Sequence, residues 1–253
     1  MSTQTSPASL TREPALLGQT VVVIGGSAGI GLETARRARS EGAGVVLTGR
    51  DPERLERAAR DVGAERFTAF DADDAEAMAR FFDELPAPLD HVLISAGGPH
   101  YGPRLLEKDV DEVRRTLSDK VVLALAVARN AIRKMRPGGS LLLVGGTGGR
   151  KINPDYGLNS TATAILPPFT ATLALELAPI RVNLIAPGFV DTSLSASLLG
   201  EGLDARREQL RSTLPIGRVV GPADVAALAV HLMANTAVTG ATYDIDGGQQ
   251  FAG

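Results

Sequence analysis

The sequence predicts an α/β fold in a single domain, a doubly wound parallel sheet of about seven strands with helices on both faces. Short aliphatic and β-branched runs alternate with helical patterns from residue 20 to residue 245, which is typical of βαβ units. The run Val92-Leu93-Ile94 is apolar without alternation, as expected for a parallel strand covered on both faces. The chain has 253 residues and is 44% hydrophobic, which is enough for one full core.

The expected elements follow from these runs in chain order. Strands are expected at 20–24, 45–47, 66–70, 92–94, 141–144, 181–185 and 241–245. Helices are expected at 31–40, 52–62, 75–85, 109–135, 171–178 and 222–234, and Pro137-Gly138-Gly139 is expected to stop the fourth. Residues 1–17 are rich in Ser, Thr and Pro and lack periodicity. We therefore expect a flexible N-terminal arm, followed by one domain over residues 18–253.

Composition limits the classes of partner. The net charge is -3 and the pI is near 5.7, so there is no basic footprint for nucleic acid or for a membrane surface. The chain has no cysteine, which excludes disulfides, thiolate metal sites and a cysteine nucleophile, and no metal site is predicted. No apolar run has the length of a membrane span. We expect a small-molecule substrate and a cytoplasmic location.

A glycine-rich segment, Gly25-Gly26-Ser27-Ala28-Gly29-Ile30-Gly31, separates the first expected strand from the first expected helix. Glycines allow the backbone to approach a pyrophosphate, and a helix N-terminus offers unpaired N–H groups and the positive end of a dipole. The segment therefore predicts a dinucleotide site. The alternative is a tight connection with no ligand.

Other short motifs follow the later strands. Asp71-Ala72 follows the third strand, Ser95-Ala96-Gly97 the fourth, and a turn beginning Pro187-Gly188 the sixth, so they share the edge of the sheet where ligands bind. With Arg181-Val182-Asn183 and Asp246-Gly247-Gly248, this pattern resembles the short-chain dehydrogenase/reductase family over about residues 18–250. The resemblance implies a Rossmann-like fold and a nicotinamide cofactor. Ser95 stands where the family usually has Asn, and Ile24 where it often has Thr.

The resemblance also implies which residues contact the cofactor, position by position. They are Gly25, Ser27, Ile30 and Gly31 at the pyrophosphate and adenosine ribose, Asp71 and Ala72 at the adenine, Ser95, Ala96 and Gly97 near the ribose, and Pro187, Gly188, Val190 and Thr192 in the turn that holds the carboxamide.

The choice of cofactor is argued from charge. The second strand is followed by Gly49-Arg50, which places no carboxylate where the ribose 2′-hydroxyl of NAD(H) would be bound. The guanidinium of Arg50 can instead pair with a 2′-phosphate. The sequence thus favours NADP(H) over NAD(H). The alternative is that Arg50 only caps the start of a solvated helix beside Asp51.

The catalytic residues implied by the resemblance are absent. The family uses a Tyr, a Lys four residues later and a Ser thirteen residues earlier. Counting back from residues 175–177 without gaps places Asn159, Thr163 and Gly146 at these positions. No lysine follows Lys151, so no other register restores the pair. The family's helical Asn falls near Lys120, and the alternative is that Lys120 is a charge on the helix surface.

Three residues are candidates for a substitute catalytic group. Tyr156 lies three residues before the vacant tyrosine position and reaches the site if the Gly-rich segment folds inward; otherwise it is a loop tyrosine on the rim. Asn159 is a candidate for orienting the substrate through its amide, which has no transferable proton. Thr147 is either an oxyanion donor or a turn-stabilising hydroxyl. His100 and Tyr101 are expected in a loop over the substrate.

Pro167-Pro168 predicts that the helix usually begun near Asn159 starts close to Pro167 or is kinked there. The pocket before it would then be reshaped.

The sequence leaves several functions open. The first is an NADP(H)-dependent oxidoreductase with a non-standard site, acting on an imine, an iminium or a carbonyl compound. Hydride addition to an iminium forms no oxyanion, and Asp155 could favour such a cation. The alternatives are a catalytically silent cofactor-binding sensor, an inactive subunit of a hetero-oligomer, or a non-redox enzyme. A homodimer or homotetramer is expected through the apolar helix around Val121, Leu125 and Ala128 and the helix 171–178.

Overall fold

The computed structural model describes residues 13–98, 104–150 and 156–252. Its centre is a seven-stranded sheet of order β3-β2-β1-β4-β5-β6-β7, in which every neighbouring pair is parallel. The strands are β1 Thr20–Ile24, β2 Gly44–Gly49, β3 Arg66–Ala69, β4 Leu89–Ile94, β5 Met135–Val144, β6 Arg181–Pro187 and β7 Thr242–Ile245. The strand order reverses between β1 and β4, so the carboxyl ends of these strands border the crevice where doubly wound folds bind ligands.

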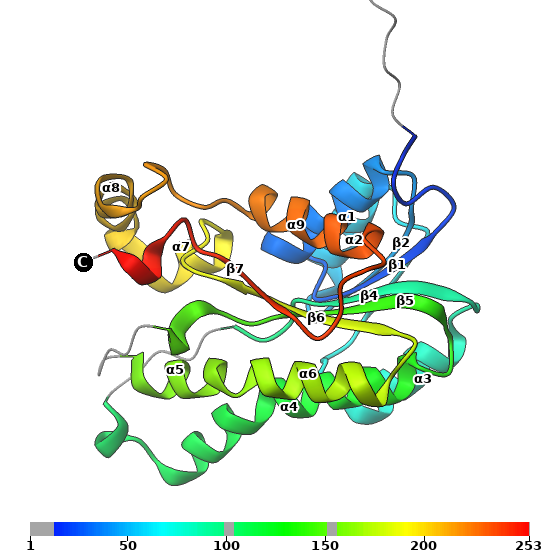
Figure 1. The fold of residues 1–253 in the computed structure, drawn as a ribbon, viewed down its shortest axis with the longest axis horizontal. Helices are drawn as coiled ribbons and strands as arrows, with labels where there is room; N and C mark the ends of the chain where they lie inside the picture. Colours follow the sequence, from blue (N-terminus) through cyan, green and yellow to red (C-terminus); the bar gives the residue numbers. More distant parts are fainter. Residues whose placement is uncertain (1–12, 99–103, 151–155, 253) are drawn as a thin grey trace, which may run out of the picture.

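Helices cover both faces of this sheet (Figure 1). Helices α1, α2 and α9 lie on one face, and α3, α4, α5 and α6 lie on the other. Their bounds are α1 Gly29–Ser40, α2 Pro52–Val62, α3 Ala75–Glu84, α4 Val110–Ala131, α5 Gly157–Ala164, α6 Leu166–Glu176, α7 Ser193–Leu199, α8 Leu203–Thr213 and α9 Pro222–Ala234. The predicted doubly wound α/β fold is confirmed. None of the helices in the described ranges is both long and apolar enough to cross a membrane.

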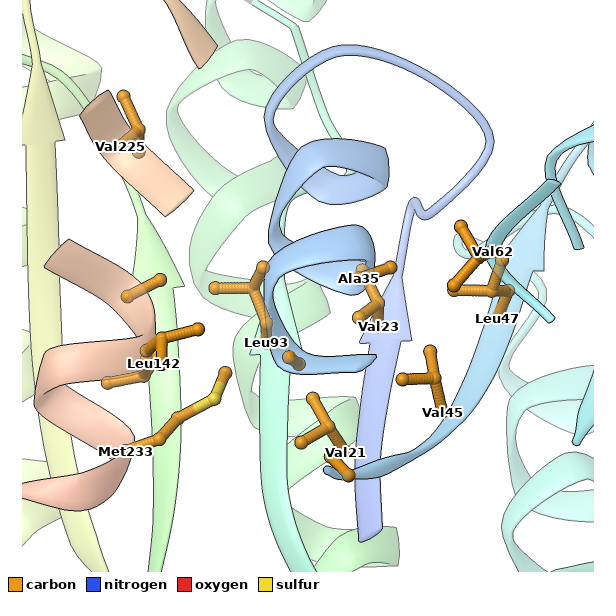
Figure 2. Packing of buried hydrophobic residues seen from close by; sticks show 14 of the residues in the cluster. Val21, Val23, Ala35, Val45, Leu47, Val62, Leu93, Leu142, Val225 and Met233 are labelled. Atoms are coloured by element: carbon orange, nitrogen blue, oxygen red, sulfur yellow. The ribbon is translucent and has the colours of Figure 1, made fainter. Parts of the chain in front are cut away.

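Two buried clusters hold the layers together. Alternate residues of one strand face opposite layers, so Val21 and Val23 belong to the cluster under α1 and α9, while Val22 belongs to the cluster under α3, α4 and α6. Figure 2 shows the first cluster, with Leu93 of β4 beside the helix that carries Ala35. Burial of both faces explains why the central strands are apolar without alternation.

The packed fold starts earlier than residue 18, where the sequence placed the boundary. The side chain of Leu16 is 0% exposed and packs in the cluster under α1 and α9. Its backbone N–H donates to the carbonyl oxygen of Glu41 over 2.9 Å. Leu16 is therefore part of the core. The end of the segment 1–17, which the sequence predicted to be flexible, is packed into the domain.

Pro137-Gly138-Gly139 does not stop the fourth helix, as the sequence had predicted. Helix α4 ends at Ala131, and the three residues lie inside β5. A Cβ on Gly139 would stand 2.5 Å from the carbonyl oxygen of Asp90, and the pairing register shifts between Leu89 and His91. The Pro-Gly-Gly segment thus forms an irregularity in a strand, where close backbone approach requires glycine.

Candidate active site

The glycine-rich turn is held against the end of β4. Gly25 has φ +91°, and a Cβ on it would lie 2.7 Å from the backbone nitrogen of Ala96. A Cβ on Gly31 would lie 2.2 Å from the carbonyl oxygen of Gly25. The N-cap residue of α1, Ala28, makes no capping hydrogen bond through its side chain. The first N–H groups of α1 thus face a turn with no bulky side chain, which fits a pyrophosphate.

The ends of three strands meet around this turn. The hydroxyl of Ser95 at the end of β4 donates to the carbonyl oxygen of Gly25 over 3.0 Å. From the loop after β6, the methyl group of Thr192 lies 3.5 Å from where a Cβ on Gly29 would stand. The structure therefore brings together the pyrophosphate, ribose and carboxamide segments that the resemblance implied.

The loop after β6 is fixed from several sides. A Cβ on Gly188 would meet the Cβ of Asp246 at 2.7 Å, so the chain passes closely under the C-terminal turn. Thr192 and Ser195 form a capping box at the start of α7. The guanidinium of Arg207 on α8 binds both carboxylate oxygens of Asp191 at 2.8 Å. These contacts place Val190 and Thr192 on a rigid support.

The end of β2 has the geometry expected for the adenosine side. Gly49 is buried, and a Cβ on it would stand 3.0 Å from the hydroxyl of Ser27. Arg50, the next residue, is exposed. The N-cap of α2 is Asp51, whose carboxylate accepts from the backbone N–H of Arg54 over 2.9 Å. The alternative in which Arg50 caps this helix is therefore wrong, because Asp51 provides the cap.

Acidic residues follow β3. The carboxylate of Asp71 accepts from the backbone N–H of Asp73 over 3.2 Å. Burial raises the pKa of Asp73, as do the charges of Asp71 and Asp119, whereas Arg50 lowers it. The charge of Arg50 thus acts near the loop that carries Asp71 and Ala72, in line with one adenosine subsite between β2 and β3.

The three positions that the gap-free register aligned with the family's catalytic residues lie together. A Cβ on Gly146 would stand 3.4 Å from the methyl group of Thr163. A Cβ on Gly148 would stand 3.3 Å from the amide nitrogen of Asn159. The hydroxyl of Thr163 donates within its own helix, at 3.0 Å from the carbonyl oxygens of both Asn159 and Ser160. The register that places these residues at one site is thus spatially consistent.

Small side chains leave a cavity of about 70 Å³ beside these positions. It is lined by Gly146, Gly149, Arg150, Thr163, Ala164, Pro167, Leu184, Ala186 and Thr242. Arg150 pairs with Asp244 of β7 at 3.2 Å, which anchors the loop after β5 to the edge strand.

The other catalytic candidates lie at the border of this region. Thr147 is buried and begins a short 3-10 helix. Tyr156 is the N-cap residue of α5 and its side chain is 47% exposed. Asp155, Lys151, His100 and Tyr101 lie outside the described residues.

The helix that carries Asn159 and Thr163 begins at Gly157, so the expected start close to Pro167 is wrong. Helical structure is interrupted at Ile165 and resumes in α6, which has Pro167 in its first turn. Proline is tolerated there because the first N–H groups of a helix have no intrahelical partner. Figure 1 shows α5 and α6 end to end. The alternative that the sequence left open was a kink at the prolines, and the structure has a one-residue interruption just before them.

Lys120 is partly buried, so it is not a fully exposed surface charge. It lies on α4, and its ammonium donates to the carbonyl oxygen of Gly97 over 3.3 Å. Burial lowers the pKa of Lys120, and the neighbouring Asp119 opposes this shift. The sequence placed Lys120 near this site but could not fix the direction of its side chain, which depends on the packing of α4.

Known proteins resemble the chain over nearly its whole length. The family described as enoyl-(acyl carrier protein) reductase matches residues 25–250. The chain belongs to the short-chain dehydrogenase/reductase family. It is 31% identical over 236 residues to the 3-oxoacyl-[acyl-carrier-protein] reductase of Homo sapiens, covering 90% of this chain and 96% of that one.

Two further members of the family bear on the cofactor. An NADP-dependent (R)-specific alcohol dehydrogenase of Lentilactobacillus kefiri is 30% identical and covers 92% of this chain and 97% of its own. A solved structure of a small-chain dehydrogenase in complex with NADPH superimposes with a TM-score of 0.80 at 28% identity, covering 92% of this chain and 99% of the other.

Proposed function

We propose that this protein is an NADP(H)-dependent oxidoreductase that transfers a hydride between the nicotinamide and a small organic molecule. The observation that carries the proposal is the glycine-rich turn at the start of α1, where side chains at Gly25 and Gly31 would clash with the backbone. Ser95 and Thr192 border the same turn from β4 and from the loop after β6. The cofactor, when bound, supplies or accepts the hydride.

The preference for NADP(H) rests on Arg50. It is exposed at the end of β2, next to the buried Gly49, and the cap of α2 is provided by Asp51. A guanidinium in this place can pair with the 2′-phosphate. The relative from Lentilactobacillus kefiri is named as NADP-dependent, which supports the same preference.

The active site that we propose is atypical. Reduction of a carbonyl places negative charge on oxygen and needs a proton donor. The amide of Asn159 can orient a substrate, Thr147 is a candidate donor to an oxyanion, and Tyr156 at the start of α5 is the candidate acid. An iminium substrate would need no proton, because hydride addition neutralises its charge. The substrate is therefore an imine, an iminium or a carbonyl compound.

A second function is a cofactor-binding protein without turnover, either a sensor or an inactive subunit of a hetero-oligomer. One observation favours it: the hydroxyl of Thr163 donates to its own helix at 3.0 Å, so it is engaged in structure. A non-redox enzyme on the same scaffold is the third function considered.

Binding and hydride transfer separate these functions. Titration with NADPH, followed by its fluorescence, tests the cofactor site. Oxidation of NADPH is then followed with a panel of ketones and preformed iminium ions, and reduction of NADP⁺ with alcohols. Turnover of any panel member at a rate abolished in Gly31→Ala would support the oxidoreductase. Binding without turnover would favour the silent protein, and absence of NADPH binding would overturn the proposal.

A further inference from the structure

We propose that Lys120 binds the nicotinamide-bearing half of the dinucleotide through its ammonium group. The inference rests on the proposed function and adds a contact from α4, a helix that the glycine-rich turn does not include.

The first argument is the attachment of Lys120 to the end of β4. Its ammonium is 3.3 Å from the carbonyl oxygen of Gly97, a residue with φ +85°. Gly97 directly follows Ala96, whose backbone nitrogen closes the glycine-rich turn at 2.7 Å from a Cβ built on Gly25. The ammonium is thus tied to the segment that borders the pyrophosphate site.

The second argument is the side of the crevice on which Lys120 lies. The sheet order reverses between β1 and β4, so a dinucleotide bound across this point has its halves on opposite sides. Arg50 and Asp71 mark the β2 and β3 side for the adenosine half. Lys120 lines a small cavity with Ala96 of the β4 end and Val144 of β5. Lys120 therefore lies on the side of the crevice that would hold the nicotinamide-bearing half.

The third argument is the number of hydrogen-bond donors. A lysine ammonium has three N–H donors, and the carbonyl of Gly97 is the acceptor that the described residues give it. The rest of the cavity lining is mostly aliphatic, from Ile94, Leu123, Ala124, Leu143 and Leu166. Lys120 is only partly buried, and even partial removal of an ammonium from water is unfavourable unless its donors are used. The cavity measures about 10 Å³, which is about the space that one water molecule needs.

The fourth argument concerns the opposite wall of the site. Thr163 of α5 offers no charge, and its hydroxyl donates to Asn159 and Ser160 of its own helix. No lysine follows Lys151 in the sequence. Lys120 is therefore a lysine that reaches the end of β4 from α4, through its contact with Gly97.

A comparison of two ligands tests the proposal. NADPH contains both halves of the dinucleotide, whereas 2′,5′-ADP contains only the adenosine half with its 2′-phosphate. Lys120→Met should weaken NADPH binding about tenfold or more, which corresponds to at least ~1.4 kcal/mol, and leave 2′,5′-ADP binding within about twofold of the parent. Lys120→Arg, which keeps the charge, should retain most of the affinity.

The matched control is Lys134→Met. Lys134 also donates to backbone carbonyl oxygens, those of Asp83 and Leu85 at 3.0 and 2.9 Å, but it precedes β5 and lies away from the carboxyl ends. The Lys134→Met protein should bind NADPH and 2′,5′-ADP as the parent does. If Lys120→Met binds both ligands normally, or loses both equally, the role of Lys120 is wrong while the proposed function stands. If the parent binds neither ligand, both proposals fail.

A measurement on the unaltered protein avoids dependence on the folding of Lys120→Met. The chain has only four lysines, Lys108, Lys120, Lys134 and Lys151, so carbon-labelled lysine gives four side-chain NMR signals that single Lys→Arg variants assign. NADPH should shift the Lys120 signal, and 2′,5′-ADP should not. A Lys120 signal that is unchanged by saturating NADPH would overturn the proposal.

Discussion

The hydroxyl group of Ser95 donates a hydrogen bond to the carbonyl oxygen of Gly25 over 3.0 Å. The bond joins the end of β4 to the glycine-rich turn after β1. The same hydroxyl oxygen lies 2.4 Å from where a Cβ on Gly31 would stand. Turn, strand end and helix start are thus packed with no space for one more methyl group.

Gly31→Ala should therefore abolish the cofactor site. Its Cβ would stand 2.2 Å from the carbonyl oxygen of Gly25, so the turn must move away from α1. We expect NADPH affinity to fall by more than about tenfold, since a displacement of about 1 Å strongly weakens a positioned contact. Gly202→Ala is the control, because nothing lies within 4 Å of a Cβ there. Fluorescence titration measures both, and equal affinities would contradict the packing argument.

Arg50→Ala should reduce the preference for NADPH over NADH. The guanidinium is exposed beside the expected 2′-phosphate, and loss of one charge-assisted contact should cost NADPH about tenfold in affinity while leaving NADH almost unchanged. Arg57→Ala, an exposed arginine of α2 near Glu53, controls for the loss of positive charge. Equal dissociation constants for the two cofactors in the parent would remove the basis of this prediction.

The stability of the fold should fall below neutral pH because of His91. Its ring nitrogens contact the hydroxyl of Ser140 at 2.8 Å and the side-chain oxygen of Gln19 at 2.6 Å. Burial, aided by the charges of Arg181 and Arg136, lowers the pKa of His91 from 6.5 to about 3. The folded protein keeps the ring neutral where the unfolded chain takes up a proton. This histidine therefore destabilises the fold as the pH drops from 6.5 towards 3, by up to ~1.4 kcal/mol per pH unit, and has no such effect above 6.5.

Replacement of the histidine isolates this effect from the titration of carboxylates. His91→Gln removes the ionisation, so its free energy of unfolding in urea should depend less steeply on pH between 6 and 4. His231→Gln, on the exposed face of α9, should leave the slope of the parent. An identical slope in His91→Gln and the parent would show that His91 does not control the pH dependence.

Restoration of the family residues should create ketone reduction. Helix α5 already spans positions 159 and 163, and a Cβ on Gly146 lies 3.4 Å from Thr163. The argument that the prolines displace this helix start no longer applies. We expect the combined Gly146→Ser, Asn159→Tyr and Thr163→Lys protein to reduce ketones at least ~10²-fold faster than the parent, as a general acid allows. The variant without Asn159→Tyr should gain nothing, and a gain without the tyrosine would refute this account.

We also propose a homodimer or homotetramer through the same two helices as the sequence predicted, α4 and α6, but through other side chains of α4. Ala128 is buried in the core, and Val121 and Leu125 pack against that cluster. On α4 the apolar side chains of Val110 and Val122 remain exposed, at 69% and 59%, and on α6 that of Leu175 remains exposed, at 82%. The double change Val122→Glu and Leu175→Glu should shift the sedimentation coefficient to that of a monomer. Leu17→Glu, at another exposed leucine, should not, and a monomeric parent would exclude the proposal.

Helices with local start and stop signals were predicted to within one residue of their observed bounds. Helix α2 has Pro52 in its first turn, Asp51 as its cap and Gly63 in the left-handed region at its end, and α9 likewise begins at a proline. These signals act within a few residues, so sequence alone reveals them. The position of the glycine-rich turn between β1 and α1 was predicted for the same reason.

Features that depend on distant parts of the chain were missed. Helix α8 is rich in charged residues and buries only Leu210, so it has little apolar periodicity, and its attachment comes from the pairing of Arg207 with Asp191. The side chain of Lys120 is placed by α4 packing beside β4. In neither case does a neighbouring residue in the sequence reveal the partner.

The burial of Leu16 limits how the chain can be shortened or fused. A cut after residue 17 would remove a side chain that is 0% exposed and would expose the cluster under α1 and α9, at a cost of about 2–5 kcal/mol for a leucine of this kind. Expression tags, cleavage sites and fusion partners should therefore join the chain before Glu13, so that Leu16 remains in place for folding.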